Sequence, residues 1–366
     1  MSHRSSDERA TGPETGSGPG RATLAGAYHL VIFDLDGVIY LGTEPVAGAA
    51  DAVEATVDGG TPVAFVTNNA SRRAAEVGTL LRGMGVKARN DDVLTSAQAA
   101  AELLATDLPA GSPVLVVGAP ALRQEIEAVG LAPVDRAEAR PLAVVQGYGP
   151  DVGWAVLAEA SVAIRAGAQW VATNTDATLP SPRGPLPGNG SLVAALSTAL
   201  GRGPDVVVGK PEPAMFRLLA EHRKASSALV VGDRLDTDIE GANRAGMAGL
   251  LVLTGVSTPV DVMQAPATRR PTYLAADCRA LSTSEDQVRV PDWDGTRVVS
   301  AGWRVTHRDD KLELTGQGDD VAALRGLAPA AWAHPDWSGI IAEEQPAAEA
   351  VGRLGLGRYA GWALAR

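Results

Sequence analysis

Short apolar runs alternate with helix-like stretches along most of the chain between residues 29 and 280. Residues 30–33 and 62–66 are apolar and rich in β-branched side chains, and an Ala-rich helical stretch over 46–57 lies between them. Strands that alternate with helices at this spacing predict a parallel sheet with helices on both faces. Ligands of such sheets bind beyond the carboxyl ends of the strands, so we look for chemistry there.

The same alternation starts afresh after Thr95. It contains apolar runs at 114–118, 142–148 and 170–174, with helices predicted near 122–129 and 156–166. The Pro- and Gly-rich run LPSPRGPLPGNG at 179–190 then breaks the pattern. We therefore expect an inserted α/β cap domain over 97–189. The core is expected to consist of residues 26–96 and 190–280.

After this break the chain is predicted to return to the core sheet. A helix is expected over 192–200, followed by strands over 206–209, 228–232 and 250–255. The predicted fold class is therefore α/β, with a Rossmann-like parallel-sheet core, an inserted α/β cap domain and a small C-terminal α+β unit.

The two ends of the chain differ from this pattern. Residues 1–25 are rich in Gly, Ser, Pro and Arg without periodicity, so we expect a flexible tail. The C-terminal α+β unit is expected over 285–366, with antiparallel strands at 296–306 and 311–315. Five of the seven tryptophans lie in this last part: Trp293, Trp303, Trp332, Trp337 and Trp362.

Composition and charge narrow the class of function. The 366 residues are 45% hydrophobic and 20% charged, which is typical of a multidomain globular protein. The net charge of −11 repels nucleic acids and anionic lipid surfaces, so we expect no nucleic-acid partner. With one cysteine, Cys278, no intrachain disulfide can form. No apolar stretch is long enough for a membrane helix or resembles a signal peptide, so we expect a cytoplasmic protein with no membrane partner.

Four short segments carry the candidate chemistry, and each ends or follows an apolar run. They are FDLDGV at 33–38, VTNN at 66–69, GKPEP at 209–213 and GDRLDTD at 232–238. Each segment alone also has an ordinary interpretation as a helix cap, a turn or a surface lysine. Together they offer carboxylates, a hydroxyl and a lysine, which are the groups needed to move a phosphoryl group with a divalent metal.

Asp34 and Asp36 lie two residues apart at the end of the first strand, and Gly37 allows the chain to bend there. We predict that the Asp34 carboxylate attacks phosphorus, and that Asp36 protonates the departing alkoxide and later activates water. Because these anions repel a phosphate, a cation must neutralise them. Mg²⁺ with oxygen ligands suits this role, and Asp233 is a natural further ligand.

The remaining motif residues are predicted to bind the phosphate and to support the metal site. The Thr67 hydroxyl and the backbone amides of Asn68 and Asn69 are expected to bind nonbridging oxygens, and a helix N-cap role for Thr67 is compatible. Lys210 is expected to stabilise the phosphoryl charge and to hold Asp34. Asp238 is not expected to bind the metal itself. It is expected to orient Lys210 or the water molecules bound to the metal.

Taken together, these segments resemble the haloacid dehalogenase superfamily of phosphatases over residues 28–258. The positions that match its four motifs are, in order, Asp34 with Asp36, Thr67, Lys210, and Asp233 with Asp238. The place of the insertion, together with the segments TNTDATLP and LPGNGS, is similar to the type IIA cap. That cap is found in the nitrophenyl phosphatase, phosphoglycolate phosphatase and pyridoxal phosphatase branch.

The resemblance implies a ligand set and a substrate-binding set. Mg²⁺ would be held by the side chains of Asp34 and Asp233 and by the backbone carbonyl of Asp36. The phosphate of the substrate would meet Thr67, Asn68, Asn69 and Lys210. Asn174 and Asp176 on the cap would line the entrance, although an Asx turn is an alternative role. Caps of this type often mediate dimerisation, which implies a homodimer through the cap or the C-terminal unit.

The C-terminal unit resembles that of glycerol-3-phosphate phosphatases of actinobacterial type, which carry a partial acetyltransferase-like fold. The run GRLGLG at 352–357 has Gly352 where the coenzyme-binding pattern has Gln or Arg. We therefore expect a structural unit or an interaction surface. A vestigial acyl-coenzyme site is the alternative.

The expected function is a Mg²⁺-dependent phosphomonoesterase that acts on a small phosphate ester such as glycerol 3-phosphate. Phosphoglycolate, pyridoxal phosphate or a nucleotide are alternative substrates. A phosphomutase on the same scaffold would transfer the group to a sugar hydroxyl, and a dehalogenase would lack a counterpart of Asp36. A non-catalytic scaffold that uses the Trp-rich C-terminal unit is the alternative from another class.

Overall fold

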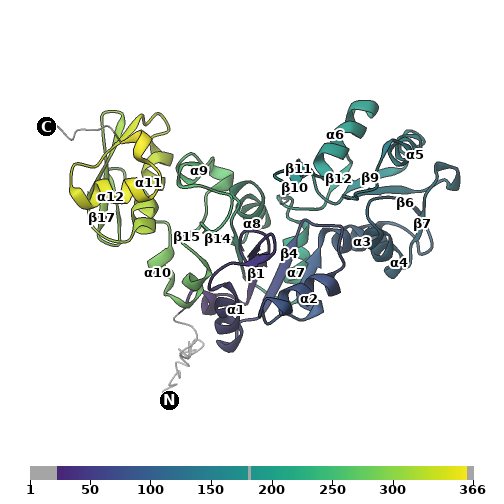
Figure 1. Cartoon of the computed structure of the whole chain (residues 1–366), viewed down its shortest axis with the longest axis horizontal. Coiled ribbons are helices and arrows are strands. Elements are labelled where there is room, and N and C mark those ends of the chain that lie inside the picture. The colour runs from purple at the N-terminus through teal and green to yellow at the C-terminus, as the bar shows by residue number, and fades with distance from the viewer. Residues whose placement is uncertain (1–22, 180–182, 361–366) are drawn as a thin grey trace, which may run out of the picture.

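The computed structural model describes residues 23–179 and 183–360, which form a core with one further unit at each end (Figure 1). The core sheet contains β1 (Leu30–Asp34), β4 (Val63–Thr67), β5 (Val93–Thr95), β13 (Ala228–Gly232), β14 (Ala248–Val252) and β15 (Tyr273–Ala275). Its order is β15-β14-β13-β1-β4-β5, and all its strand pairs are parallel. The predicted α/β fold class is therefore confirmed.

Helices cover both faces of this sheet because its central strands are apolar on both sides. Val31 and Phe33 pack in one cluster with α1 (Ala49–Asp58) and α2 (Ala74–Gly83). Leu30 and Ile32 pack in a second cluster with α3 (Ser96–Asp107) and α7 (Ala214–His222). Successive strand residues point to opposite faces, so a continuous apolar run indicates a strand buried on both. Only the strand ends remain open to a ligand.

The cap is a second parallel sheet, with the order β12-β9-β8-β6-β7. Its strands are β6 (Pro113–Val117), β7 (Ala132–Val134), β8 (Ala143–Gln146), β9 (Gln169–Ala172) and β12 (Val206–Val207). Its helices are α4 (Pro120–Ala128), α5 (Trp154–Arg165) and α6 (Asn189–Leu200). A small hairpin of β10 (Thr178–Leu179) and β11 (Leu186–Pro187) precedes α6.

The cap extends further along the chain than the sequence predicted. Val206 and Val207 pair with β9 of the cap sheet and not with the core sheet. Val193 and Leu196 of α6 pack in the same apolar cluster as Trp170 of the cap. Residues 190–207 were expected in the core, and that expectation was wrong. A two-residue strand carries no signal of its own that selects one sheet over another.

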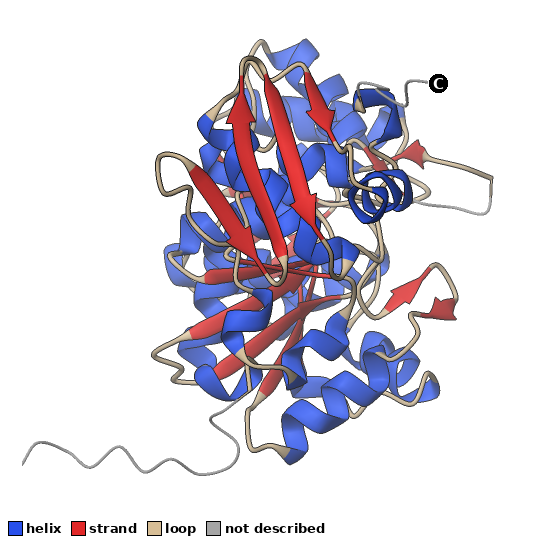
Figure 2. Ribbon diagram, turned by 90° about the vertical axis from the view of Figure 1, so that its left-hand side faces the viewer, coloured by secondary structure: helices blue, strands red, loops and turns tan. Residues whose placement is uncertain are grey.

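The C-terminal unit is a four-stranded sheet with two longer helices (Figure 2). It contains β16 (Arg297–Ser300), β17 (Trp303–Arg308), β18 (Lys311–Gly316), β19 (Gly339–Ile341), α11 (Asp320–Ala333) and α12 (Gln345–Arg353), and the short helix α10 (Glu285–Val288) precedes it. The expected strand at 296–306 is in fact two strands. A tight turn separates them at Ala301 (φ 40°) and Gly302 (φ 92°), where both residues have positive φ.

The two ends of the described chain add two further results. Residues 1–22 of the expected tail lie outside the described residues, as does Trp362. Leu24 and Ala25 do not belong to a tail, because both are buried in the core and the Leu24 amide donates to the Thr283 carbonyl at 2.7 Å. Within residues 23–179 and 183–360, no helix combines the length and apolarity needed to cross a bilayer.

Candidate active site

The predicted motif residues converge at the carboxyl edge of the core sheet. β1 lies between β13 and β4, so Asp34 at the end of β1 is flanked by the ends of both neighbours. Thr67 ends β4, and Asp233 directly follows β13. The parallel arrangement therefore brings together residues that lie up to two hundred positions apart in the sequence.

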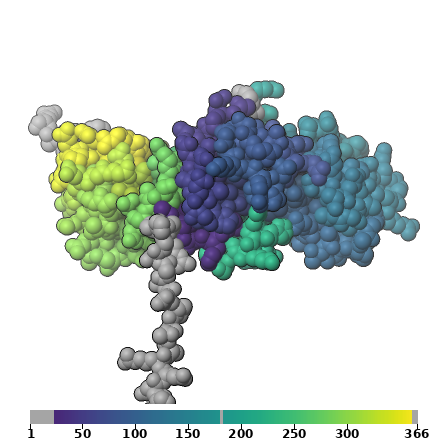
Figure 3. Space-filling model, turned by 90° about the horizontal axis from the view of Figure 1, so that it is seen from below, coloured from purple at the N-terminus to yellow at the C-terminus, as the bar shows by residue number. Residues whose placement is uncertain are grey.

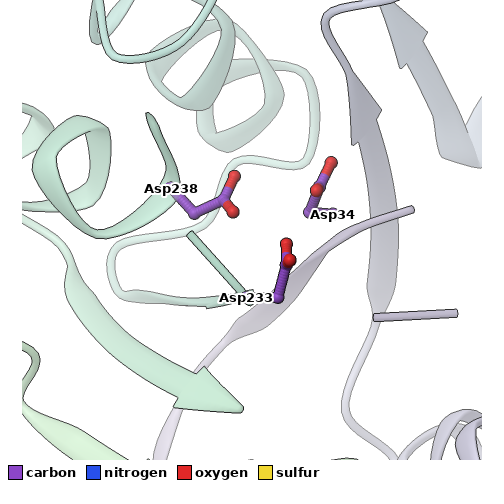
Figure 4. A group of neighbouring side chains, drawn as sticks. All are labelled: Asp34, Asp233 and Asp238. Carbon is purple, nitrogen blue, oxygen red and sulfur yellow. The ribbon is translucent and has the colours of Figure 1, made fainter. Parts of the chain in front are cut away.

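Three carboxylates form a buried cluster at this edge (Figure 4). Asp34, Asp233 and Asp238 each offer an oxygen, and these oxygens all lie within 4.8 Å of one another. Asp238 is contributed by the irregular helical turn Leu235–Ile239 that follows β13. Among the residues that the structure describes, no other group of acidic, histidine or cysteine side chains meets the same criterion for a metal site.

Lys210 lies between two of these carboxylates. Its Nζ donates to Asp34 Oδ1 and to Asp238 Oδ1, both at 2.6 Å, and all three side chains are buried. Burial alone would lower the pKa of Lys210, but the carboxylates of Asp238 and Asp34 outweigh it and raise that pKa above its ordinary value. Lys210 is therefore a fixed positive charge against Asp34.

Asp233 is held on one side only. Its Oδ2 accepts a hydrogen bond from the Val256 amide at 2.7 Å, whereas its buried Oδ1 has no hydrogen-bond partner. Burial, followed by the neighbouring charges of Asp238 and Asp34, raises the pKa of Asp233 to about 7. One lysine cannot neutralise three buried carboxylates, and an unpaired buried carboxylate is costly. A hard divalent cation with oxygen ligands fits both the charge excess and the free oxygen of Asp233.

Asp36 differs from Asp34 because its side chain is exposed. Desolvation by the surrounding chain raises its pKa, and the charges of Lys210 and Arg72 oppose that rise. Gly37 follows with a φ of 84°, and its amide donates to the Tyr40 carbonyl at 2.7 Å in the turn that leads to the small hairpin β2 (Tyr40–Leu41) and β3 (Glu44–Pro45). This turn leaves the Asp36 carboxylate exposed and within electrostatic reach of Lys210.

Thr67 and Asn69 form a compact turn next to Asp34. The Thr67 hydroxyl accepts a hydrogen bond from the Asn69 amide at 3.1 Å, and Asn69 Oδ1 accepts one from the Ser71 amide at 2.8 Å. The next helix, α2, begins only at Ala74. The alternative of a helix N-cap at Thr67 is therefore wrong, because six residues separate it from the helix.

Asn68 connects the core, the segment that carries Lys210 and the cap. Its Oδ1 accepts from the Lys210 amide at 2.8 Å, and its Nδ2 donates to the Lys210 carbonyl at 3.0 Å. The same Nδ2 lies 3.1 and 3.2 Å from the two carboxylate oxygens of Asp176. The Asn68 side chain is therefore engaged, and its carbonyl accepts from Ser96 Oγ and Asn174 Nδ2, which leaves its backbone amide for a ligand.

The two predicted cap residues lie at the junction with the core. Asn174 Nδ2 donates to the Asn68 carbonyl at 2.7 Å, and its Oδ1 accepts from the Asp176 amide at 3.2 Å, which forms an Asx turn. Burial raises the pKa of Asp176, although its hydrogen bond from Asn68 lowers it. Both residues therefore contact the core through Asn68.

Two further observations concern residues in and beyond the fourth motif. Asp236 forms a paired contact with Arg234 at 3.0 and 2.9 Å and takes no part in the carboxylate cluster. The loop after β14 was missed by our sequence reasoning: Thr254 Oγ1 donates to the Gly37 carbonyl at 2.5 Å, and Val256 holds Asp233. The apolar run at 250–255 ends at the same sheet edge, which was a usable signal.

The run GRLGLG does not have the setting of a coenzyme-binding loop. Gly352 and Arg353 form the end of α12, and the rest of the run follows that helix. A helix N-terminus attracts phosphate groups, whereas a helix C-terminus carries the negative end of the dipole. The geometry therefore gives no support to an acyl-coenzyme site at this segment.

A parallel core sheet with an inserted cap and carboxylates at adjacent strand ends defines a hydrolase of the haloacid dehalogenase class. Family profiles agree: residues 31–132 match haloacid dehalogenase-like hydrolases, and residues 207–281 match a second HAD-hydrolase-like family. Residues 300–356 match a GCN5-related N-acetyltransferase like domain. The chain belongs to the haloacid dehalogenase-like hydrolases, as its motifs predicted.

Comparison with individual proteins gives a more specific similarity than the family match. The chain is 47% identical over 312 residues to a D-glycerol 3-phosphate phosphatase of Mycobacterium tuberculosis, which covers 85% of this chain and 87% of the relative. A crystal structure of the M. tuberculosis glycerol phosphate phosphatase with magnesium has a TM-score of 0.85 at 44% identity, covering 92% and 99% of the two chains. A 4-nitrophenylphosphatase from Thermotoga maritima has a TM-score of 0.65 at 32% identity, covering 70% and 97%.

Proposed function

We propose that this protein is a Mg²⁺-dependent phosphomonoesterase that hydrolyses glycerol 3-phosphate. The observation that carries the proposal is the contact of Asp34 with Lys210 beside the free buried oxygen of Asp233. The D-glycerol 3-phosphate phosphatase of M. tuberculosis, which matches most of this chain, supports the choice of substrate. Phosphoglycolate, pyridoxal phosphate and nucleotides remain the alternative substrates.

Asp34 is the proposed nucleophile. Lys210 holds Oδ1 of Asp34, so the second carboxylate oxygen is available for in-line attack on phosphorus. The attack forms an aspartyl phosphate and breaks the bond to the alkoxide, which Asp36 protonates. Asp36 then removes a proton from the water that hydrolyses the aspartyl phosphate.

The side chains of Asp34 and Asp233 and the backbone carbonyl of Asp36 would hold Mg²⁺. When bound, the ion neutralises the carboxylates and the negative charge of the phosphate. Asp238 keeps Lys210 against Asp34, because Lys210 donates to both.

The phosphate is proposed to meet the Thr67 hydroxyl, the backbone of Asn68 and Asn69, and Lys210. In this structure the Asn69 amide donates to Thr67, so it must turn to reach a phosphate oxygen. Asn174 and Asp176 fix the cap at the entrance through their bonds to Asn68.

Asp34→Asn tests the nucleophile. We expect turnover of glycerol 3-phosphate to fall to background in a phosphate-release assay with Mg²⁺, while circular dichroism shows a native fold. Asp236→Asn is the matched control, since it makes the same chemical change in a residue bound only to Arg234 and should retain turnover. Retained activity in the Asp34 variant would remove the proposed nucleophile.

A panel of esters and acceptors separates the remaining alternatives. Faster release of phosphate from phosphoglycolate, pyridoxal phosphate or a nucleotide would reassign the substrate, and transfer to a sugar hydroxyl would indicate a phosphomutase. A scaffold would release no phosphate from any ester.

We further propose a cytoplasmic homodimer that associates through the cap. The free, buried Cys278 is consistent with a reducing compartment. The cap helix α5 leaves Trp154 83% exposed and Val162 58% exposed, and large apolar side chains are enriched at protein interfaces. Light scattering of the wild type and of Trp154→Lys tests this: a dimer that becomes monomeric supports it, and a monomeric wild type refutes it.

A further inference from the structure

The C-terminal unit packs against the side of the core that holds Asp233. Its helix α11 is buried without interruption from Val321 to Ala331, because it lies between the C-terminal sheet and the core. On the core side α11 contacts α9 (Pro259–Met263) and β15. A helix that is apolar on most of its surface is expected to be enclosed in this way. Figure 3 shows the C-terminal unit and the cap at opposite ends of the core, so this contact is independent of the cap.

Directed polar contacts fix α9 and β15 to the C-terminal unit. Trp332 Nε1 donates to the Val262 carbonyl in α9 at 2.8 Å, and the Arg270 guanidinium lies 5.0 Å from the centre of the Trp332 ring. Arg325, which is only 7% exposed, donates from Nη1 to the Leu274 carbonyl of β15 at 2.8 Å. A half-buried tryptophan or a buried arginine that donates to one backbone carbonyl defines position as well as adding packing.

The residues that lead into α9 are the residues that hold Asp233. Thr258 caps α9 by accepting from the Asp261 amide at 3.3 Å. Directly before it, the Val256 amide donates to Asp233 Oδ2 at 2.7 Å, and the Ser257 amide donates to the Asp233 carbonyl at 3.1 Å. Ser257 Oγ also accepts from the Leu235 amide at 3.0 Å. Val256 thus lies three residues before the first residue of α9, so a shift of α9 moves the donor that holds Asp233.

The turn that carries Asp238 is linked to the same unit by apolar packing. Leu235 and Ile239 bound this turn, and both belong to one apolar cluster with Val262 of α9 and with Trp303 and Leu324 of the C-terminal unit. Packed interiors transmit displacements because they contain little free volume. The C-terminal unit therefore contributes part of the apolar cluster that supports both Asp233 and Asp238.

We propose that the C-terminal unit positions Asp233 for the metal through α9 and the loop Thr254–Thr258, and that Trp332 is a positioning residue of the metal site. The proposal rests on the proposed function, since it assigns Asp233 to a bound cation. Metal ligands must be held within roughly 0.5 Å of their working positions, and their supporting contacts contribute to affinity. The acetyltransferase-like unit then contributes to the phosphatase reaction by supporting a metal ligand.

The test compares Trp332→Ala with Trp337→Ala in the full-length protein. Trp337 lies in the same unit and packs on Tyr359, with ring centres 5.3 Å apart, so its loss weakens the unit without touching α9. Trp332→Phe is a milder variant that removes the donor to Val262 but keeps an aromatic ring at this position. We expect calorimetric titration with MgCl₂ to show roughly two- to thirtyfold weaker binding for Trp332→Ala and an unchanged affinity for Trp337→Ala. Saturating Mg²⁺ should restore most of the kcat of the Trp332 variants.

A second measurement needs no metal and no turnover. Hydrogen exchange of the Val256 and Ser257 amides in the metal-free protein should be faster in both Trp332 variants than in Trp337→Ala. These two amides donate to Asp233, so their exchange rates measure how stably Asp233 is held. Wild-type Mg²⁺ affinity and exchange in Trp332→Ala would overturn the proposal, as would equal losses in Trp337→Ala. If the wild type itself neither binds Mg²⁺ nor hydrolyses glycerol 3-phosphate, the proposed function fails instead.

Discussion

Gly255 gives the sharpest test of the metal site, because an added methyl group meets the carboxylate of Asp233. A Cβ at this position would lie 2.0 Å from Asp233 Oδ2, 2.6 Å from Cγ and 2.9 Å from Cβ. Its backbone is not in the left-handed region, so alanine introduces no backbone strain. Rotation of the carboxyl group cannot relieve the contact, since Cβ of Asp233 is also too close.

The cost in activity follows from the size of the required movement. Because heavy atoms rarely approach a Cβ within 3.0 Å, Asp233 must shift by about 1 Å or more, and a misplacement of about 1 Å costs on the order of a hundredfold in rate. For Gly255→Ala we therefore expect kcat/KM to fall by about a hundredfold, or about 2.7 kcal/mol, together with weaker Mg²⁺ binding.

The assay is phosphate release from glycerol 3-phosphate over a range of Mg²⁺ concentrations, with calorimetry of Mg²⁺ binding. Gly83→Ala is the matched control, since nothing lies within 4 Å of its Cβ position at the end of α2. It should keep full activity and gain stability, by about 0.5–1 kcal/mol. Wild-type kcat/KM and Mg²⁺ affinity in Gly255→Ala would refute the assignment of Asp233 to the metal.

Two further predictions concern Lys210 and pH. Asn68→Ala removes both side-chain hydrogen bonds to the Lys210 peptide, so kcat should fall roughly tenfold and by more than in Asn69→Ala; an equal or larger loss in the Asn69 variant would contradict this role. Because the pKa of Asp233 is raised to about 7 in the metal-free protein, lowering the pH from about 7 to about 6 should weaken Mg²⁺ binding by about fivefold in calorimetry, since the cation requires the ionised carboxylate. Stability has the opposite pH dependence. Without metal, the free energy of unfolding should decrease as the pH rises from about 4 to about 7 and then level off, because over this range the unfolded chain ionises Asp233 while the folded chain keeps it protonated.

The core could be read from the sequence because its strands are buried on both faces. The run at 228–232 has the bounds of β13, and the run at 30–33 lies within β1. Short elements carry no such signal, because two or three residues are too few to show a continuous apolar run. Val206 and Val207 could pair at the edge of either sheet, and the turn at Ala301 and Gly302 lacks the Asn-Gly or Asp-Gly pair that usually indicates a hairpin.

The candidate site was predictable only as far as strand ends determine it. Asp34, Thr67 and Asp233 meet because parallel strands end at one edge, which periodicity alone indicates. The sequence could not show that the Asn68 side chain is engaged by Lys210 and Asp176, because those bonds join positions more than a hundred residues apart. Long-range polar contacts leave no local pattern.

The misplaced strand also changes how the cap and Lys210 are related. Lys210 follows β12 by only three residues, so the chain reaches Lys210 directly from the edge of the cap sheet. At Gly209 an added Cβ would lie 2.5 Å from the Thr173 carbonyl oxygen and 2.8 Å from Asn68 Oδ1, which shows how closely the cap, the core and this segment approach. Without an anchor, any rotation of the cap would move the lysine away from Asp34. Asn68 pairs with both polar groups of the Lys210 peptide, and so it fixes Lys210 to the core.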